Sequence, residues 1–368
     1  MATLLYQNTP SEYRNESTQK PPREAIAVRE TSADHIIQNA RNNIATVWQG
    51  DFHNAKQVLS AIKKRVQPKP KHETDPATAF HKHRLAQSQT ARLVNMLLVE
   101  IQADLQLNLP RAPNIQAALL DVYGEHNSEK FLLPLNQLLG FIGAHEWHKK
   151  GVAIAELDDK IHVPFGVFSP IRGEYLSLLM QAKQPENAQI AFDIGTGSGI
   201  LAALLAKRGI AKIIATDTNP RAAQCARENI ARLGFSAQVS VIEQDLFPDD
   251  MADLIVCNPP WLPAKPTSAV ETALYDPEHG MLHAFLRGAA AHLRENGRVW
   301  LILSDLAEHL GLRSKDDLPH WLDKYGWEIE SSLKTTPHHN KAHDLRDPLA
   351  FARARETTYL FVLKKKVL

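Results

Sequence analysis

Asn258, Pro259, Pro260 and Trp261 form a stretch whose residue types indicate chemistry. The amide oxygen of Asn258 and the carbonyl oxygen of Pro259 each accept hydrogen bonds. Two such acceptors side by side hold the hydrogens of a planar –NH2 group and favour the charge that develops on its nitrogen during alkylation. The prolines stiffen the turn, and Trp261 offers a flat face for stacking. A strand-ending turn with a core tryptophan is the structural alternative.

A glycine-rich turn lies upstream, between an apolar run and a helix-forming run. The acid before it and the turn itself are Asp193, Gly195, Thr196, Gly197, Ser198 and Gly199. Alternate glycines leave room for a ligand against the backbone, and the next helix directs N–H groups into the same space. The dinucleotide fingerprint needs a glycine where this chain has Ile200. The turn therefore favours another cofactor, although a simple tight connection is the structural alternative.

Further polar residues follow the next predicted strands. Asp217 ends the second strand, where a carboxylate accepts the hydroxyl hydrogens of a ribose. Asp245 and Leu246 follow the third strand and supply a polar group and an apolar wall for an adenine. The sequence thus predicts an adenosine-bearing cofactor. If it is S-adenosylmethionine, Asp193 lies within reach of its amino-acid end, and Asn258, after the fourth strand, faces its sulfonium methyl.

The elements that position these residues begin near residue 169. From there strands and helices alternate to the end of the chain, which predicts an α/β domain over 169–368 with a parallel sheet covered on both faces. Before it, two short runs over 151–168 predict a β-hairpin linker. This linker separates the α/β domain from a different N-terminal pattern.

The N-terminal pattern predicts a helical domain over 31–150, preceded by a loose polar segment over 1–30. We expect this helical domain to recognise the substrate. The helices are expected over 33–48, 53–66, 77–105, 114–123 and 128–149.

Two histidine-containing runs in this half invite other interpretations. His145 and His148 flank a glutamate, but they are one residue short of the spacing in zinc proteases, so the sequence predicts no metal site. The run from His81 to Arg84 could contact phosphate, and a solvated helix face is the structural alternative.

Composition sets wide bounds on function. The chain has 368 residues, enough for two domains, and its 42 Lys and Arg nearly balance its 41 Asp and Glu. Charge therefore says nothing about the partner. Two cysteines are too few for a disulfide scaffold, which suits the cytoplasm. Because no apolar stretch has the length of a membrane span or signal peptide, we expect a cytoplasmic protein without membrane contact.

The motifs at Asp193 to Gly199, Asp217, 244–247 and Asn258 to Trp261 resemble one family of enzymes. These are the class I S-adenosylmethionine-dependent methyltransferases of the Asn-Pro-Pro-aromatic group, which includes glutamine-N5, adenine-N6 and guanine-N2 enzymes. The resemblance covers roughly the last half of the chain. It implies a seven-stranded Rossmann-like sheet, mostly parallel, with an antiparallel last strand.

Within that group the chain is similar to the HemK-like protein-glutamine methyltransferases, through the lead-in at 169–176 and the residues at 273–275 and 278–280. That similarity implies methylation of a glutamine in a release factor or ribosomal protein. Trp261 departs from the usual tyrosine of the family, and the N-terminal region is longer.

A basic segment over 334–356 leaves an RNA or DNA base (adenine N6 or guanine N2) as the alternative acceptor, reached by base flipping. Its basic residues are His338, His339, Lys341, His343, Arg346, Arg353 and Arg355. The segment could equally hold an acidic protein face or be a solvated loop. A module that binds the cofactor without catalysis, and docks a partner through its helices, is the non-enzyme alternative.

Overall fold

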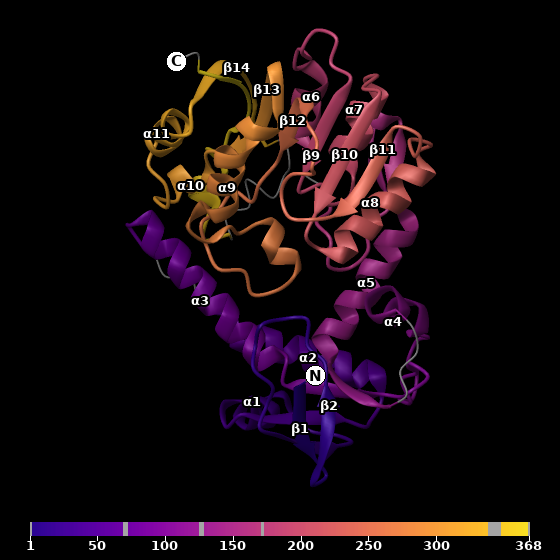
Figure 1. Ribbon diagram of the computed structural model, residues 1–368. Coiled ribbons are helices and arrows are strands. Elements are labelled where there is room, and N and C mark those ends of the chain that lie inside the picture. Colours follow the sequence, from indigo (N-terminus) through magenta and orange to yellow (C-terminus); the bar gives the residue numbers. More distant parts are fainter. Residues whose placement is uncertain (1, 69–72, 125–128, 171–172, 338–346, 367–368) are drawn as a thin grey trace. The chain divides into compact units, whose positions relative to one another are not determined.

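The computed structural model describes residues 2–68, 73–124, 129–170, 173–337 and 347–366 (Figure 1). The chain divides into two compact units. The first comprises Met1–Glu73 and His81–Trp147, and the second comprises Thr74–Phe80 and His148–Leu368. Among the described residues, no helix combines the length and apolarity that crossing a bilayer requires.

The first unit is built on a closed barrel in the order β1-β2-β6-β5-β4-β3. Its strands are β1 (Ala2–Tyr6), β2 (Thr9–Tyr13), β3 (Glu24–Val28), β4 (Ile44–Trp48), β5 (Leu97–Ile101) and β6 (Phe131–Pro134). One core cluster joins residues from several strands, including Tyr6, Tyr13, Val47, Leu98 and Leu132. The prediction of a purely helical N-terminal domain is therefore wrong.

The helices of the first unit alternate with these strands. They are α1 (Ala33–Arg41), α2 (Phe52–Val66), α4 (Gln116–Tyr123) and the greater parts of α3 (Pro76–Val94) and α5 (Leu135–Lys150). β4, β5 and β6 are short, nearly continuous apolar runs, and periodicity alone does not separate a buried strand from a buried helix segment. Asn43, with a φ of 62°, is the break between α1 and β4 that the helical pattern concealed.

The expected loose segment over 1–30 also forms strands, because β1 and β2 pair as an antiparallel hairpin. Gln7 and Asn8 at its tip have φ values of 50° and 61°, as a two-residue type I′ turn requires. Leu4 and Tyr6 are buried in the barrel. A polar composition concealed this alternation, since few apolar side chains suffice for the inner face of a short hairpin.

The second unit opens with a hairpin and continues into a seven-stranded sheet (Figure 1). The hairpin is β7 (Val152–Ile154) and β8 (Asp159–Ile161). The sheet strands are β9 (Ile190–Ile194), β10 (Lys212–Asp217), β11 (Val239–Glu243), β12 (Ala252–Cys257), β13 (Leu293–Ser304), β14 (Trp327–Thr335) and β15 (Thr358–Lys365). Their order is β11-β10-β9-β12-β13-β15-β14, and β15 runs antiparallel to both neighbours. The expected α/β sheet with an antiparallel last strand is confirmed.

Helices of the second unit complete the α/β domain. They are α6 (Glu174–Gln181), α7 (Ile200–Lys207), α8 (Pro220–Arg232), α9 (Gly280–Gly288), α10 (Leu306–His309), α11 (Asp317–Lys324) and α12 (Ala350–Arg353). β9 alternates between two apolar clusters: Ala191 packs into the cluster that contains α7, whereas Phe192 and Ile194 pack into the cluster that contains Leu282 of α9. By the same alternation, Asp193 faces the α7 side.

We expect Gly199→Ala to destabilise the second unit more than the matched substitution Gly209→Ala. Both glycines have positive φ, 82° and 90°, so both substitutions carry backbone strain of about 1–2 kcal/mol. Only at Gly199 would the new Cβ lie 3.1 Å from Cα and Cβ of Ala226, whereas Gly209 has open space. Overpacking adds about 1–3 kcal/mol. Thermal unfolding of the two variants measures this difference, and equal melting temperatures would contradict it.

Candidate functional site

The strand register brings the predicted site residues to one edge of the sheet. Ile194 at the end of β9 lies opposite Cys257 of β12 and Thr216 of β10. The next residues along the three strands are the first glycine of the turn, Asn258 and Asp217. Because these strands are parallel, all three leave the sheet at its carboxyl edge, where open α/β sheets bind ligands.

The glycine turn has the backbone that its sequence predicts. Gly195, Gly197 and Gly199 have φ values of 72°, 58° and 82°, a region that favours glycine. Their surroundings differ, however. A Cβ at Gly199 would press against α8, while a Cβ at Gly197 would meet nothing within 4 Å. Gly199 therefore permits helix packing, and Gly197 keeps open the space beside the backbone.

Asp193 is a fully buried carboxyl at the end of β9. Its Oδ2 accepts hydrogen bonds from the Thr196 hydroxyl at 2.6 Å and from the Ala202 backbone N–H at 3.0 Å. Its Oδ1 is buried and has no partner among the described residues. Burial raises the pKa of Asp193 to about 7, and the two hydrogen bonds oppose that rise. Such an acceptor is poised for a donor that the protein does not supply.

Asp217, the last residue of β10, links that strand to the glycine turn. One of its oxygens accepts the Gly197 N–H and the other accepts the Asn219 N–H, both at 2.9 Å. Burial raises the pKa of Asp217, and these backbone hydrogen bonds oppose the rise. Each carboxylate oxygen has a second lone pair, so Asp217 retains acceptor capacity for a ligand.

The remaining predicted cofactor residues divide into exposed and buried ones. Asp245 is exposed, and Leu246 beside it is half-buried with a φ of 52°. The Thr216 hydroxyl donates to the Leu246 carbonyl at 2.6 Å, which fixes this loop against β10. Thr196 and Ser198 are buried. Thr196 therefore orients Asp193 within the protein, as described above.

The corner after β12 carries a hydrogen bond that the sequence did not reveal. The Trp261 indole Nε1–H donates to Asn258 Oδ1 at 2.9 Å. The Asn258 side chain also lies near enough to the hydroxyl of Tyr175 to lower the pKa of that phenol, against the larger rise caused by burial. Asn258 and Trp261 are half-buried, and Pro259 between them is buried. Tyr175 lies in the predicted lead-in, yet nothing in its pattern distinguished it from a core aromatic.

These observations fit an adenosyl cofactor with an amino-acid end. The unpartnered Oδ1 of Asp193 is a buried acceptor, the space beside Gly197 is open, and Asp217 keeps free lone pairs. Asp245 is exposed for a further polar contact. These acceptors and the open space therefore fit S-adenosylmethionine, the cofactor that the sequence predicts.

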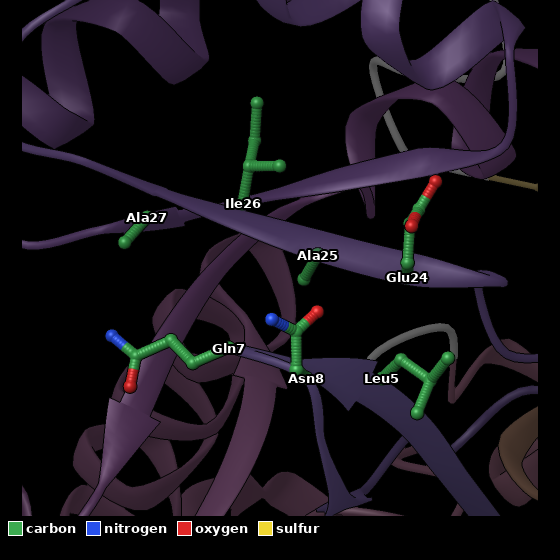
Figure 2. Close-up of a pocket in the computed structure, with 7 residues that line it drawn as sticks. All are labelled: Leu5, Gln7, Asn8, Glu24, Ala25, Ile26 and Ala27. Carbon is green, nitrogen blue, oxygen red and sulfur yellow. The ribbon is translucent and has the colours of Figure 1, made fainter.

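A hollow of about 270 Å³ lies in the first unit, lined by Leu5, Gln7, Asn8 and residues 24–27 (Figure 2). Figure 2 shows Gln7 and Asn8 on the side of β3 to which Ala25 and Ala27 point. Apolar and amide side chains dominate this lining, and its one acid, Glu24, pairs with neighbouring Arg23 at 2.5 Å.

The two histidine runs also serve local contacts. His145 on α5 pairs with Asp121 at 2.6 Å, and Lys82 on α3 pairs with Glu73 at the same distance. Among the residues that the structure describes, no group of three or more His, Cys, Asp or Glu is arranged to hold a metal. Both cysteines are buried free thiols.

The predicted basic segment falls largely outside the described residues. His338, His339, Lys341, His343 and Arg346 belong to the part that is not described. Within the described part, Arg353 pairs with Asp347 at 3.0 Å, and Arg355 is exposed.

Comparison with known proteins gives the family. The profile of the methyltransferase small domain matches residues 159–315. The chain is 34% identical over 163 residues to a release factor glutamine methyltransferase of Cereibacter sphaeroides, an alignment that covers 38% of this chain and 59% of that relative. It is 30% identical over 176 residues to a protein of Methanocaldococcus jannaschii named as a protein N5-glutamine methyltransferase, covering 46% of this chain and 84% of that relative.

A third relative acts on RNA by its name. It is a tRNA1(Val) (adenine(37)-N6)-methyltransferase of Bacteroides thetaiotaomicron, 33% identical over 108 residues that cover 28% of this chain and 43% of that protein. The family profile begins at residue 159, after the last strand of the barrel, β6. With the glycine turn, Asp217 and the Asn-Pro-Pro corner at one sheet edge, the chain belongs to the S-adenosylmethionine-dependent methyltransferases of the methyltransferase small domain family.

Proposed function

We propose that this chain is an N-methyltransferase that transfers a methyl group to a planar amide nitrogen, the side chain of a glutamine in a protein. The observation that carries the proposal is the corner from Asn258 to Trp261. It leaves β12 beside the glycine turn of β9, so a nitrogen held by the corner lies next to a cofactor on the turn. The proposed acceptors are a release factor or a ribosomal protein.

We propose that Asp193, the turn from Gly195 to Gly199, Asp217, Asp245 and Leu246 hold the cofactor. S-adenosylmethionine, when bound, supplies an electrophilic methyl group on a sulfonium. Asp193 Oδ1 would accept a hydrogen of its ammonium, and Asp217 would accept ribose hydroxyl hydrogens. The open space beside Gly197 admits the ligand to the backbone.

The corner acts on the acceptor nitrogen. An amide nitrogen is a poor nucleophile because its lone pair is delocalised into the carbonyl. Asn258 Oδ1 and the Pro259 carbonyl accept its two hydrogens, orient the nitrogen and stabilise the positive charge that develops on it. Oδ1 retains one lone pair for this task, since Trp261 occupies the other. Neither acceptor is a base, so the proton leaves to solvent.

A base of RNA or DNA is the second candidate acceptor. The adenine-N6 relative supports it, as do the basic residues over 334–356. An adenine N6 or guanine N2 amino group is planar and would use the same two acceptors. We favour glutamine because two relatives that share a larger part of this chain carry that activity in their names.

The test is transfer of labelled methyl from S-adenosylmethionine into cell extract. The proposal predicts label that protease releases and nuclease does not, and mass spectrometry that places it on a glutamine amide nitrogen. Label in nuclease-sensitive material would replace glutamine with a base. If purified wild-type protein bound the cofactor but labelled nothing, the chain would be a binding module and the enzyme proposal would be wrong.

Affinity for S-adenosylhomocysteine is expected to rise about tenfold between pH 6 and pH 8 and then level off. Burial raises the pKa of Asp193 to about 7, so the carboxylate that attracts the ligand ammonium forms across this range. Binding favours the ionised form and releases a proton, hence affinity follows ionisation. Calorimetry at several pH values measures the slope.

Asp193→Asn is the control for this pH dependence. The amide cannot ionise, so we expect weaker binding whose pH slope is lost. The same pH slope of binding in wild type and variant would contradict the role given to Asp193.

The stability of the protein without cofactor should change with pH in the opposite direction. Because the native pKa of Asp193 is raised, its contribution to stability is largest at acidic pH and declines as pH rises from about 4 to about 7.

A further inference from the structure

We propose that Tyr175 and Trp261 are positioning residues that hold the Asn258 amide with its oxygen toward the acceptor nitrogen. This inference rests on the proposed function, because it concerns the same corner. It adds Tyr175, from the helix α6 that precedes the sheet, and it gives Trp261 a hydrogen-bonding role beside stacking.

The two contacts select one of the two rotations of the amide. The indole N–H of Trp261 is a donor only, so at 2.9 Å it faces the oxygen of Asn258 and not its –NH2 group. The –NH2 group is then the end of the amide that is left for the nearby hydroxyl oxygen of Tyr175, whose pKa is raised by burial and lowered in part by the Asn258 side chain. Rotating the amide by 180° would set donor against donor at Trp261.

The rotation matters because only one end of the amide suits the reaction. An acceptor –NH2 presents hydrogens, and these need the oxygen of Asn258. An –NH2 group of Asn258 in that place would repel the acceptor and would not stabilise developing positive charge. A freely rotating amide would spend part of its time in this unproductive orientation.

Tyr175 is suited to a fixed, neutral role. It is 4% exposed, and burial together with the charge of Asp193 raises its pKa, so it stays a phenol. The coupling to Asp193 places Tyr175 close to the cofactor-side acid as well as to Asn258.

Trp261 donates a hydrogen bond to Asn258 from the edge of its ring, a position from which the tyrosine usual in the family has no donor. A tyrosine carries its donor at the far end of the ring, whereas the indole N–H lies on the ring edge. Trp261 also packs against both apolar clusters of the sheet, which limits its motion. The indole is thereby held where it fixes Asn258.

The test uses Tyr175→Phe, which keeps the ring and removes only the hydroxyl, and Trp261→Phe, which removes the indole N–H and replaces the indole with a smaller aromatic ring. At saturating S-adenosylmethionine and fixed extract, we expect the initial rate of methyl transfer to fall about tenfold, equal to about 1.4 kcal/mol in barrier. The KM for S-adenosylmethionine should stay unchanged. In an Asn258→Ala background the same substitutions should cost nothing more.

Matched controls lie elsewhere in the chain. Tyr13→Phe removes a hydroxyl that accepts from an asparagine, Asn15, at 3.0 Å, and Tyr13 is also 4% exposed. Trp327→Phe removes a buried indole N–H that donates to the Leu286 carbonyl at 2.7 Å. Both controls should keep the wild-type rate. Rate losses as large as those at the corner would assign Tyr175 and Trp261 a merely structural role.

A readout without catalysis separates this inference from the proposed function. The chain has six tryptophans, so nitrogen-15 labelling gives six indole N–H signals, and Trp261→Phe identifies one of them. We expect Asn258→Ala to shift that signal and to speed its hydrogen exchange. An unchanged signal would overturn the positioning of Asn258 by Trp261 even if methyl transfer is found. A shifted signal with no methyl transfer would support that positioning and reject the proposed activity.

Discussion

Replacing Asn258 with alanine is expected to lower the rate of methyl transfer by about 10²- to 10³-fold, the range for loss of one preorganised polar group at a reacting centre. The substitution removes the acceptor that orients the substrate nitrogen and stabilises its charge. Cofactor affinity should change little, because Asp193 and Asp217 would still hold the ligand. Methyl transfer and calorimetry with S-adenosylhomocysteine measure the two quantities separately.

Two further variants make this result specific. Asn54→Ala changes an exposed asparagine on α2, and it should leave both rate and affinity at wild-type values. Asn258→Asp keeps an oxygen acceptor at the corner and an acceptor for the Trp261 N–H, so it should retain more of the rate than Asn258→Ala. If Asn258→Ala kept more than half of the wild-type rate, the corner would not be the acceptor site.

Asp217→Ala is expected to weaken cofactor binding by about 10²-fold. It removes charge-assisted hydrogen bonds to the ribose, worth about 1.5–3 kcal/mol each. It also removes the acceptor for the N–H of Gly197 and so loosens the glycine turn. Calorimetry with S-adenosylhomocysteine measures the affinity, and a thermal melt shows whether the fold persists.

Asp249→Ala provides the comparison for Asp217. This exposed acid lies after β11 and should bind the cofactor as wild type does. With saturating cofactor, Asp217→Ala should recover much of its rate, because its defect is in binding. If Asp217→Ala bound S-adenosylhomocysteine as wild type does, or stayed inactive at saturating cofactor, Asp217 would not be the residue that binds the ribose.

The α/β half could be predicted from sequence because its signals agree with one another. In this half, apolar strands and helices alternate in order along the chain. A polar residue stands at the end of a strand, such as Asp217, or directly after it, such as Asn258. The barrel half could not be predicted from sequence. The runs at 44–48, 97–101 and 131–134 continue the apolar pattern of their neighbouring helices, and their strand character depends on pairing between segments far apart in the chain.

The site divides in the same way. Sequence predicted which residues gather at the sheet edge, because parallel register follows from the strand pattern. It could not reveal the bond from Trp261 to Asn258 or the contact with Tyr175, since both depend on side-chain orientation. Nor could it separate Gly197, beside open space, from Gly199, which packs against a helix.

A crystal structure of the chain with S-adenosylhomocysteine tests the central claim most directly. The account predicts the nucleoside over the turn from Gly195 to Gly199, with its ribose hydroxyls on Asp217 and its sulfur directed at the Asn258 oxygen across a space open to an acceptor. A nucleoside bound elsewhere, or a Trp261 ring standing between the sulfur and Asn258, would contradict it.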